Sequence, residues 1–341
     1  MGPTLSVVLS NYYHARYLPE SLGAIAAQSL PPDEVIVLDD GSSDGSVAVI
    51  ADFVRRYPFF RLIRNERNLG AMRSYNRGLA EAAGDFVLCP AADDRIRPGL
   101  FEKTAAILAR HPEAGLCSAM CGLLSPDGRD LGPLHTPAIS REACFVPPQE
   151  FFRVHARKGG WMMSQTAFYN RRALAEWGGG FDIELGSAAD GFLLYVLAAR
   201  RGACFIPERL GDWRKLDDSF ALRGAEHTGR ALAQAELLDR KLRATGLFPE
   251  AFLGWSMRST LMAILYEIIR RRPHRADEMS ATVSLLLRKD WTDRAFLAAL
   301  PRLGGATRWG AKLYLLLQHP PRERLRIVGE KFQKLISQAA R

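Results

Sequence analysis

Short β-branched runs alternate with helix-like segments through the first ninety residues, and this alternation strongly constrains the fold. Runs typical of buried strands lie at Leu5–Leu9, Val35–Leu38 and Asp85–Cys89. Apolar side chains recur at helical spacing in residues 17–29, between the first two strands, and in residues 47–57, after the second strand. Strands joined through helices need crossover connections, so the pattern predicts an α/β fold with a mostly parallel central sheet flanked by helices.

A polar cluster follows each of these strand-like runs. The clusters are Ser10–Tyr13, Asp39–Asp44 and Asp93–Arg95. Ligands of open parallel sheets bind beyond the carboxyl ends of the strands. We therefore expect the binding site of this chain at that edge of the sheet.

Carboxylates dominate the candidate chemistry. Adjacent Asp39 and Asp40 can accept hydrogen bonds from a base N–H or from ribose hydroxyls, and a turn that caps the next helix is the alternative. Asp93 and Asp94 are hard oxygen ligands that suit Mg²⁺ or Mn²⁺, which could neutralise a leaving diphosphate. A solvated acidic loop is the alternative there.

A further carboxylate lies in the second half of this region. Asp190 follows the glycine-rich segment 178–182 and precedes an apolar helical run, so we expect it at a helix N-terminus. A carboxylate there can act as general base on a hydroxyl group, and plain N-capping is the alternative.

The order of these motifs resembles glycosyltransferase family 2 of GT-A fold over about residues 4–220. The resemblance is carried by residues 6–13 as opening strand and nucleotide loop, by the segments 65–70 and 76–86, by Ala92-Asp93-Asp94 as a DxD-type motif, and by Gly179-Gly-Phe-Asp182 followed by Asp190. It implies an inverting transferase that moves a sugar from a nucleotide-diphosphate sugar, a UDP-sugar first, to a hydroxyl of a glycan or lipid-linked acceptor in surface-glycan synthesis.

The resemblance also implies roles for single residues. Ser10, Tyr12, Asp39 and Asp40 would hold the nucleoside, and Arg73 would approach the diphosphate. Asp93 would bind ribose and metal, Asp94 would be the principal ligand of Mn²⁺ or Mg²⁺, and Asp190 would be the catalytic base.

Two departures from the family pattern motivate a second hypothesis. Ala91 and Ala189 stand where the family commonly has acidic residues. A catalytically silent nucleotide-sugar-binding or scaffold protein is therefore the alternative to an active enzyme. A nucleotidyltransferase is disfavoured because Ser10–Tyr17 contains neither the glycines nor the lysine of a phosphate loop.

The last third of the chain has a different character. Residues 225–341 contain 21 Lys and Arg against 11 Asp and Glu, whereas the rest of the chain is nearly neutral. Strand patterns end there, and amphipathic helices are expected at 228–244, 251–271, 276–289, 308–318 and 321–338. We thus expect a transferase domain at 1–222 and a basic helical region at 223–341.

Three roles are open for this basic region: packing or homodimer formation, peripheral contact with an anionic inner-membrane face, and nucleic-acid binding, which no recognised motif supports. The chain has no apolar run of about 18–20 residues and no signal-peptide pattern at its N-terminus. A cytoplasmic protein is therefore expected.

Overall fold

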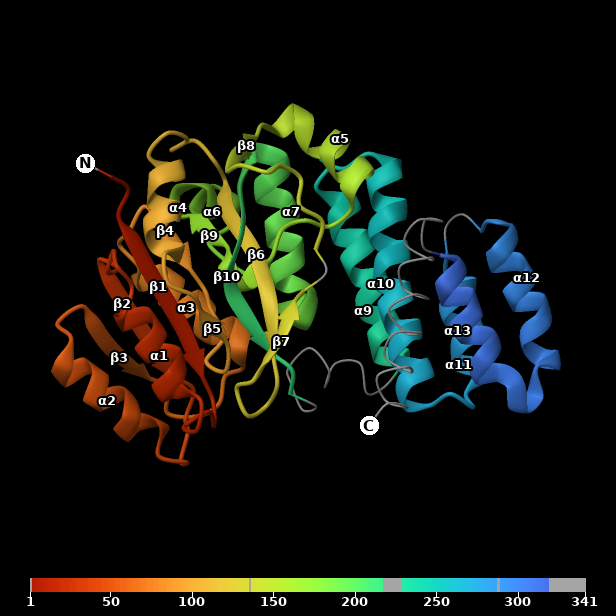
Figure 1. The fold of residues 1–341 in the computed structure, drawn as a ribbon, viewed down its shortest axis with the longest axis horizontal. Coiled ribbons are helices and arrows are strands. Elements are labelled where there is room, and N and C mark those ends of the chain that lie inside the picture. Colours follow the sequence, from red (N-terminus) through yellow and green to blue (C-terminus); the bar gives the residue numbers. More distant parts are fainter. Residues whose placement is uncertain (1, 135, 217–227, 287–288, 319–341) are drawn as a thin grey trace, which may run out of the picture. The chain divides into compact units, whose positions relative to one another are not determined.

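The computed structural model describes residues 2–134, 136–216, 228–286 and 289–318. The chain divides into two compact units, Met1–Phe220 and Ala221–Arg341 (Figure 1). The expected domain boundary after residue 222 falls outside the described residues. Each unit is described by itself below.

The first unit is built on a mixed, mostly parallel sheet, as the sequence predicts. Its strand order is β3-β2-β1-β4-β9-β6-β10-β5, with β7 beside β6 and β8 beside β10. The strands are β1 (Leu5–Asn11), β2 (Glu34–Asp39), β3 (Phe60–Arg64), β4 (Phe86–Leu88), β5 (Arg95–Ile96), β6 (Leu116–Leu124), β7 (Asp130–Pro133), β8 (Cys144–Val146), β9 (Phe168–Asn170) and β10 (Ala203–Arg214).

Helices flank this sheet (Figure 1). They are α1 (Leu18–Ala26), α2 (Ser46–Arg56), α3 (Ala71–Glu81), α4 (Leu100–Leu108), α5 (Pro148–Lys158), α6 (Arg171–Trp177) and α7 (Ala189–Arg201). Short 3₁₀ turns, η1 (Ser164–Thr166) and η2 (Ile183–Ala188), lie before β9 and α7.

The side-chain alternation of β1 explains how helices cover both faces of the sheet. Val7 and Leu9 share one hydrophobic core with Leu22 of α1 and Ile50 of α2. Val8 points the other way, because successive strand residues face opposite sides. On that side α3 approaches so closely that a Cβ on Gly78 would lie 2.4 Å from Val8 Cγ1. Glycine at this position lets α3 pack directly on the sheet.

The second unit is helical throughout its described part. Its helices are α9 (Thr228–Ala244), α10 (Glu250–Arg271), α11 (Ala276–Ser284), α12 (Trp291–Ala299) and α13 (Thr307–Leu317), with the 3₁₀ turns η3 (Leu300–Arg302) and η4 (Gly304–Ala306) before α13. Leu261, Leu265 and Ile268 of α10 centre its core. No helix in the described ranges combines the length and hydropathy that a membrane crossing requires.

The helix expectations for this unit are largely confirmed, with two corrections. The helix expected at 276–289 ends at Ser284, and α12 was not expected. In the sequence, Asp290 marks the end of the apolar pattern, but in the structure it is the N-cap of α12. The side chains of Asp290 and Asp293 each accept the backbone N–H of the other residue, which forms a capping box. The helix expected at 321–338 lies outside the described residues.

Candidate active site

The parallel register of the first strands brings the three polar clusters together. Asn11 at the end of β1 is paired with Asp39 at the end of β2. On the other side of β1, Ser10 forms a parallel bridge with Ala91, two residues before Asp93. The three clusters therefore line one edge of the sheet, as expected from the strand-end rule.

Asp39 forms the floor of this edge. Its side chain is fully buried. Asn11 Nδ2 donates to its Oδ1 at 2.8 Å, and the backbone N–H of Ser42 donates to its Oδ2 at 3.0 Å. Asn11 Oδ1 is buried and accepts no hydrogen bond within the described ranges. That oxygen is an open acceptor beside a buried carboxylate.

The carboxylate of Asp40 is occupied by hydrogen bonds from within the protein. One of its oxygens accepts hydrogen bonds from Asn65 Nδ2 and the N–H of Leu69, both at 2.8 Å, and the other accepts from the N–H of Gly70 at 2.9 Å. Next to it, Gly41 has φ of 80°, and a Cβ there would lie 2.9 Å from a backbone carbon of Arg67. Asp40 thus fixes the loop 65–70 at the edge of the site.

The loop after β1 presents two tyrosines. Tyr12 and Tyr13 are exposed, and their rings meet edge to face with centroids 4.4 Å apart. Tyr13 adopts φ of 58°, a conformation that non-glycine residues adopt uncommonly. Its N–H donates to Ser42 Oγ at 3.1 Å, which holds the loop against the turn after β2. Ser10, before this loop in β1, is half-buried.

Asp93 and Asp94 lie in the turn between β4 and β5. Asp94 is buried, and its Oδ1 accepts the backbone N–H of Arg214 at 2.8 Å. Burial raises the pKa of Asp94 well above its ordinary value, and the neighbouring charge of Asp93 raises it further, against the lowering effect of Arg214. Two crowded carboxylates of this kind are stabilised by a cation.

These carboxylates fit one part of a metal site. Asp94 Oδ2 and the carboxylate of Asp93 accept no hydrogen bond from the described part of the chain, and hard oxygens suit Mg²⁺ or Mn²⁺. Among the described residues, no cluster of three or more His, Cys, Asp or Glu side chains could enclose a metal. The pair therefore fits a cation whose other ligands are substrate phosphates and water.

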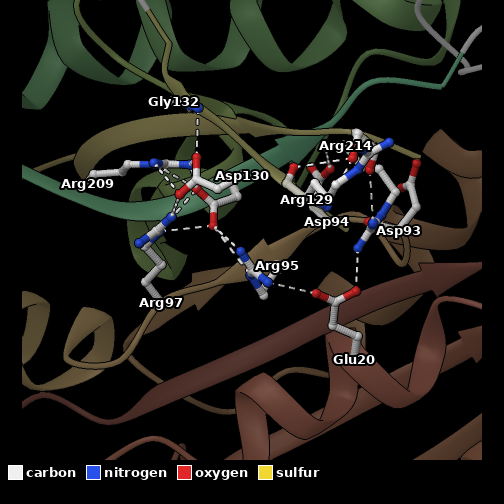
Figure 2. A network of polar contacts seen from close by, with 12 residues as sticks. Glu20, Asp93, Asp94, Arg95, Arg97, Arg129, Asp130, Gly132, Arg209 and Arg214 are labelled. Carbon is white, nitrogen blue, oxygen red and sulfur yellow. Dashed lines mark hydrogen bonds and ion pairs between the residues drawn. The ribbon is translucent and has the colours of Figure 1, made fainter. Parts of the chain in front are cut away.

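A group of arginines and carboxylates beside this turn was not foreseen from the sequence (Figure 2). Asp212 of β10 has a fully buried side chain that forms ion pairs with Arg95, Arg97 and Arg209 at 3.1, 2.9 and 2.6 Å. Asp130 also pairs with Arg97 and Arg209, each at 2.8 Å. Its pKa is lowered, first by the hydrogen bond from Arg209. We call Arg95, Arg97, Asp130, Arg209 and Asp212 the arginine cluster.

Asp190 lies in the first turn of α7, as the sequence predicts. Its Oδ1 accepts the N–H of Gly191 at 2.7 Å. Burial raises its pKa above the ordinary value of 3.8. Burial raises the pKa of Tyr169, and the charge of Asp190 raises it further.

Aromatic side chains connect the segment before Asp190 to the turn that carries Asp93 and Asp94. The ring of Phe181 lies 5.7 Å from that of Tyr75 on α3 and 5.9 Å from that of Tyr169. Tyr75 donates to the carbonyl of Pro90 at 2.9 Å, and the charges of Asp93 and Asp94 add to the burial that raises its pKa. The segment that leads to Asp190 and the turn that carries the acidic pair thus meet at one aromatic cluster.

The position of Arg73 does not connect it to the acidic pair. It is exposed in the first turn of α3, and its guanidinium reaches the carbonyl of Leu69 only at 3.5 Å. The structure does not bring it into contact with the carboxylates of the turn at Asp93. The other expected site residues except Asp190 border the same sheet edge.

Comparison with known proteins points to one family. Residues 6–160 match the family model described as "Glycosyl transferase family 2". The uncharacterized protein MT1568 of Mycobacterium tuberculosis is 29% identical over 293 residues, which are 82% of this chain and 89% of that protein. Further curated relatives match over only 29–36% of this chain and span 27–40% of their own length.

Solved structures share the fold at low sequence identity. TarS of S. aureus, solved as residues 1–349 in complex with UDP-GlcNAc, has a TM-score of 0.65 and 17% identity, with 91% of each chain covered. The mannosyltransferase PcManGT of Pyrobaculum calidifontis, solved with GDP-Man and Mn²⁺, has a TM-score of 0.53 and 20% identity, with 94% of this chain and 89% of that chain covered.

Proposed function

Because this chain belongs to glycosyltransferase family 2 through its residues 6–160, we propose that it transfers a sugar from a nucleoside diphosphate sugar to an acceptor hydroxyl with inversion. The observation that carries the proposal is the register of β1, which places the cluster at Asp39 on one side and the pair Asp93–Asp94 on the other. A nucleoside diphosphate needs polar contacts for its base and ribose, and it needs a group that neutralises the charge of its phosphates. The two sides of β1 offer this combination.

The nucleoside end lies at β1 and β2 in this proposal. Tyr12 offers an exposed ring for the base, and Asn11 Oδ1 is the open acceptor beside buried Asp39. In this proposal the ribose lies next to the base, near Ser10 and Asp93. Asp40 acts on the nucleotide indirectly, because its oxygens hold the loop 65–70. Arg73, exposed beside that loop, has the freedom to turn toward the diphosphate.

The diphosphate end lies at Asp93 and Asp94. A bound Mn²⁺ or Mg²⁺ would neutralise the charge of the leaving diphosphate. Asp94 Oδ2 and the carboxylate of Asp93 would hold the ion. Support for a metal comes from these unpaired oxygens and from PcManGT, whose structure contains Mn²⁺.

Asp190 is the base in this proposal. Its carboxylate takes the proton of the acceptor hydroxyl as the oxygen attacks the anomeric carbon and the bond to the diphosphate breaks on the opposite face. One such displacement inverts the anomeric centre. The position of Asp190 in the first turn of α7, half-buried and hydrogen-bonded to the N–H of Gly191, suits a carboxylate that must be oriented.

A UDP-sugar is the donor to test first, since TarS was solved with UDP-GlcNAc. The test is a melting-temperature screen of UDP-, GDP- and dTDP-sugars with and without Mn²⁺, followed by transfer assays, because a ligand that binds the folded state raises the melting temperature. Donors that bind without turnover on any acceptor would instead support the silent binding protein suggested by Ala91 and Ala189. No stabilisation by any donor would contradict both readings.

The second unit gives a reason to propose a lipid-linked or surface-glycan acceptor. Trp309 and Leu313 are 72% and 57% exposed on one side of α13, four residues apart. Lys312 lies over the Trp309 ring at 5.0 Å. Exposed Trp and Leu next to lysine on a basic helical region suit the surface of an anionic membrane, where each Lys or Arg contributes about 1 kcal/mol. Peripheral contact at the inner membrane face is therefore part of the proposal, with homodimer formation as the alternative.

A further inference from the structure

Arg214 contacts both members of the acidic pair without using their free oxygens. Its backbone N–H donates to Asp94 Oδ1 at 2.8 Å, and its Nε donates to the backbone carbonyl of Asp93 at 2.7 Å. Its side chain is almost fully buried. The contacts fix the turn from behind, so Asp94 Oδ2 and the Asp93 carboxylate stay available for a ligand.

Both terminal nitrogens of Arg214 also donate hydrogen bonds. Nη1 donates to the carbonyl of Ser125 at 3.2 Å, and Nη2 donates to Glu20 Oε2 at 2.5 Å. The guanidinium carbon lies 5.0 Å from the centre of the Tyr17 ring. A planar guanidinium can satisfy these directions at once, whereas the single ammonium of lysine cannot.

Glu20 joins Arg214 to the arginine cluster (Figure 2). Its second oxygen accepts Arg95 Nη1 at 2.9 Å. Arg95 in turn pairs with Asp212, whose backbone is the register partner of Arg95 between β10 and β5. The connection runs from α1 through Glu20 to the end of β10, so residues 194 positions apart hold the same turn.

We propose that Arg214, held by Glu20, is a positioning residue that orients Asp93 and Asp94 toward the divalent cation of the donor complex. The inference rests on the proposed function, because it concerns the cation that would accompany the nucleotide. Groups that orient metal ligands without touching the metal commonly change metal affinity by about 10- to 100-fold when they are removed.

The variants Arg214→Lys and Glu20→Gln test this inference. Glu20→Gln keeps the side-chain volume of a partly exposed residue, so it serves if Arg214→Lys folds poorly. Arg55→Lys is the matched control, because Arg55 pairs only with exposed Asp52 on α2 among the described residues. For each purified full-length protein, melting temperature, Mn²⁺ affinity in the presence of UDP, and UDP affinity in EDTA are measured.

The expected result is an affinity for Mn²⁺ in the UDP complex that is about 10- to 100-fold weaker in both variants, with unchanged affinity for UDP in EDTA. A purely structural role would weaken both affinities together, and that outcome overturns the inference, as does unchanged Mn²⁺ affinity in folded variants. If the parent protein binds UDP equally with Mn²⁺ and EDTA, the proposed metal use fails first and the inference fails with it.

Discussion

Asn76 on α3 exchanges two hydrogen bonds with the backbone of Phe181, 105 residues further along the chain. Its Nδ2 donates to the Phe181 carbonyl at 2.8 Å, and its Oδ1 accepts the Phe181 N–H at 2.7 Å. Phe181 packs between Tyr75 and Tyr169. The contact therefore ties the segment leading to Asp190 to the helix that carries Tyr75.

Asn76→Ala should destabilise the first unit by about 1–3 kcal/mol, because it leaves backbone groups of Phe181 without partners. Urea unfolding measures the loss, and Asn76→Asp should also destabilise, because one carboxylate oxygen would face the Phe181 carbonyl that the amide now donates to. Gly180→Ala should be harmful only while Asn76 is present, since the added Cβ would lie 2.3 Å from Asn76 Oδ1. Additive effects in the double variant would show that the contact is not the cause.

Asp190→Asn should reduce transfer by at least about 100-fold and leave donor affinity unchanged, because the amide cannot take a proton from the acceptor. Initial transfer rates and donor titration calorimetry separate the two effects. Asp182→Asn is the matched control, since asparagine can replace the Asp182 oxygen that accepts the N–H of Glu184 at the start of η2. Equal turnover by Asp190→Asn and the parent would remove Asp190 from the base role.

The raised pKa of Asp190 has two consequences for pH dependence. A base must be ionised, so kcat should fall with falling pH through a pKa above the ordinary 3.8. Burial raises a carboxyl pKa because it disfavours the charged form. The stability that the neutral carboxyl group contributes is therefore lost as pH rises from the pKa of the unfolded state through the pKa of the folded state. Asp190→Asn should therefore melt at a higher temperature than the parent at pH 7. A lower melting temperature would contradict the sign of this effect.

Asp40→Asn should destabilise the loop 65–70, because an amide group would face at least one of the N–H groups that the carboxylate now accepts. A loss of about 1–3 kcal/mol is expected in urea unfolding. The control is Asp52→Asn, an exposed carboxylate on α2 that pairs with Arg55. Weaker donor binding without lower stability would assign Asp40 directly to the nucleotide rather than to the loop.

Trp309→Ala combined with Leu313→Ala should reduce flotation with vesicles containing anionic lipid, and neutral vesicles should bind neither protein strongly. Leu131→Ala, at a leucine of the first unit that is 53% exposed, is the control. Truncation near residue 320 extends the same assay to the basic segment outside the described residues. Unchanged flotation would contradict membrane contact through α13, and a parent dimer that the double variant converts to monomer would favour a homodimer surface there.

The first half of the sheet was predictable because its strands are bounded by clear turns and helices. Val35–Leu38 is a continuous apolar run, and the helical spacing after it marks a crossover. The later strands give no such signal. Ser118 and Gly122 interrupt the apolar pattern of β6, and β10 contains Pro207 and Glu208 at a register shift against β6.

The site was predictable where its residues are consecutive. The acidic pairs at Asp39 and Asp93 follow strands, so position along the chain sufficed to find them. The arginine cluster could not be found in this way, because Arg95, Asp130 and Asp212 come from three strands whose pairing the sequence does not reveal. In the sequence, Asp212 looks like any surface aspartate, and only the fold encloses it.

The position of β9 between β4 and β6 sets an order of events during synthesis. β9 pairs with both neighbours, yet it is made after them, from residues 168–170. A nascent chain of 160 residues therefore contains the whole matched segment 6–160 but presents two separate sheet fragments with open edges. Fragments of this protein that end there should be captured by chaperones or aggregate, and the emergence of β9 is the step that makes a single sheet.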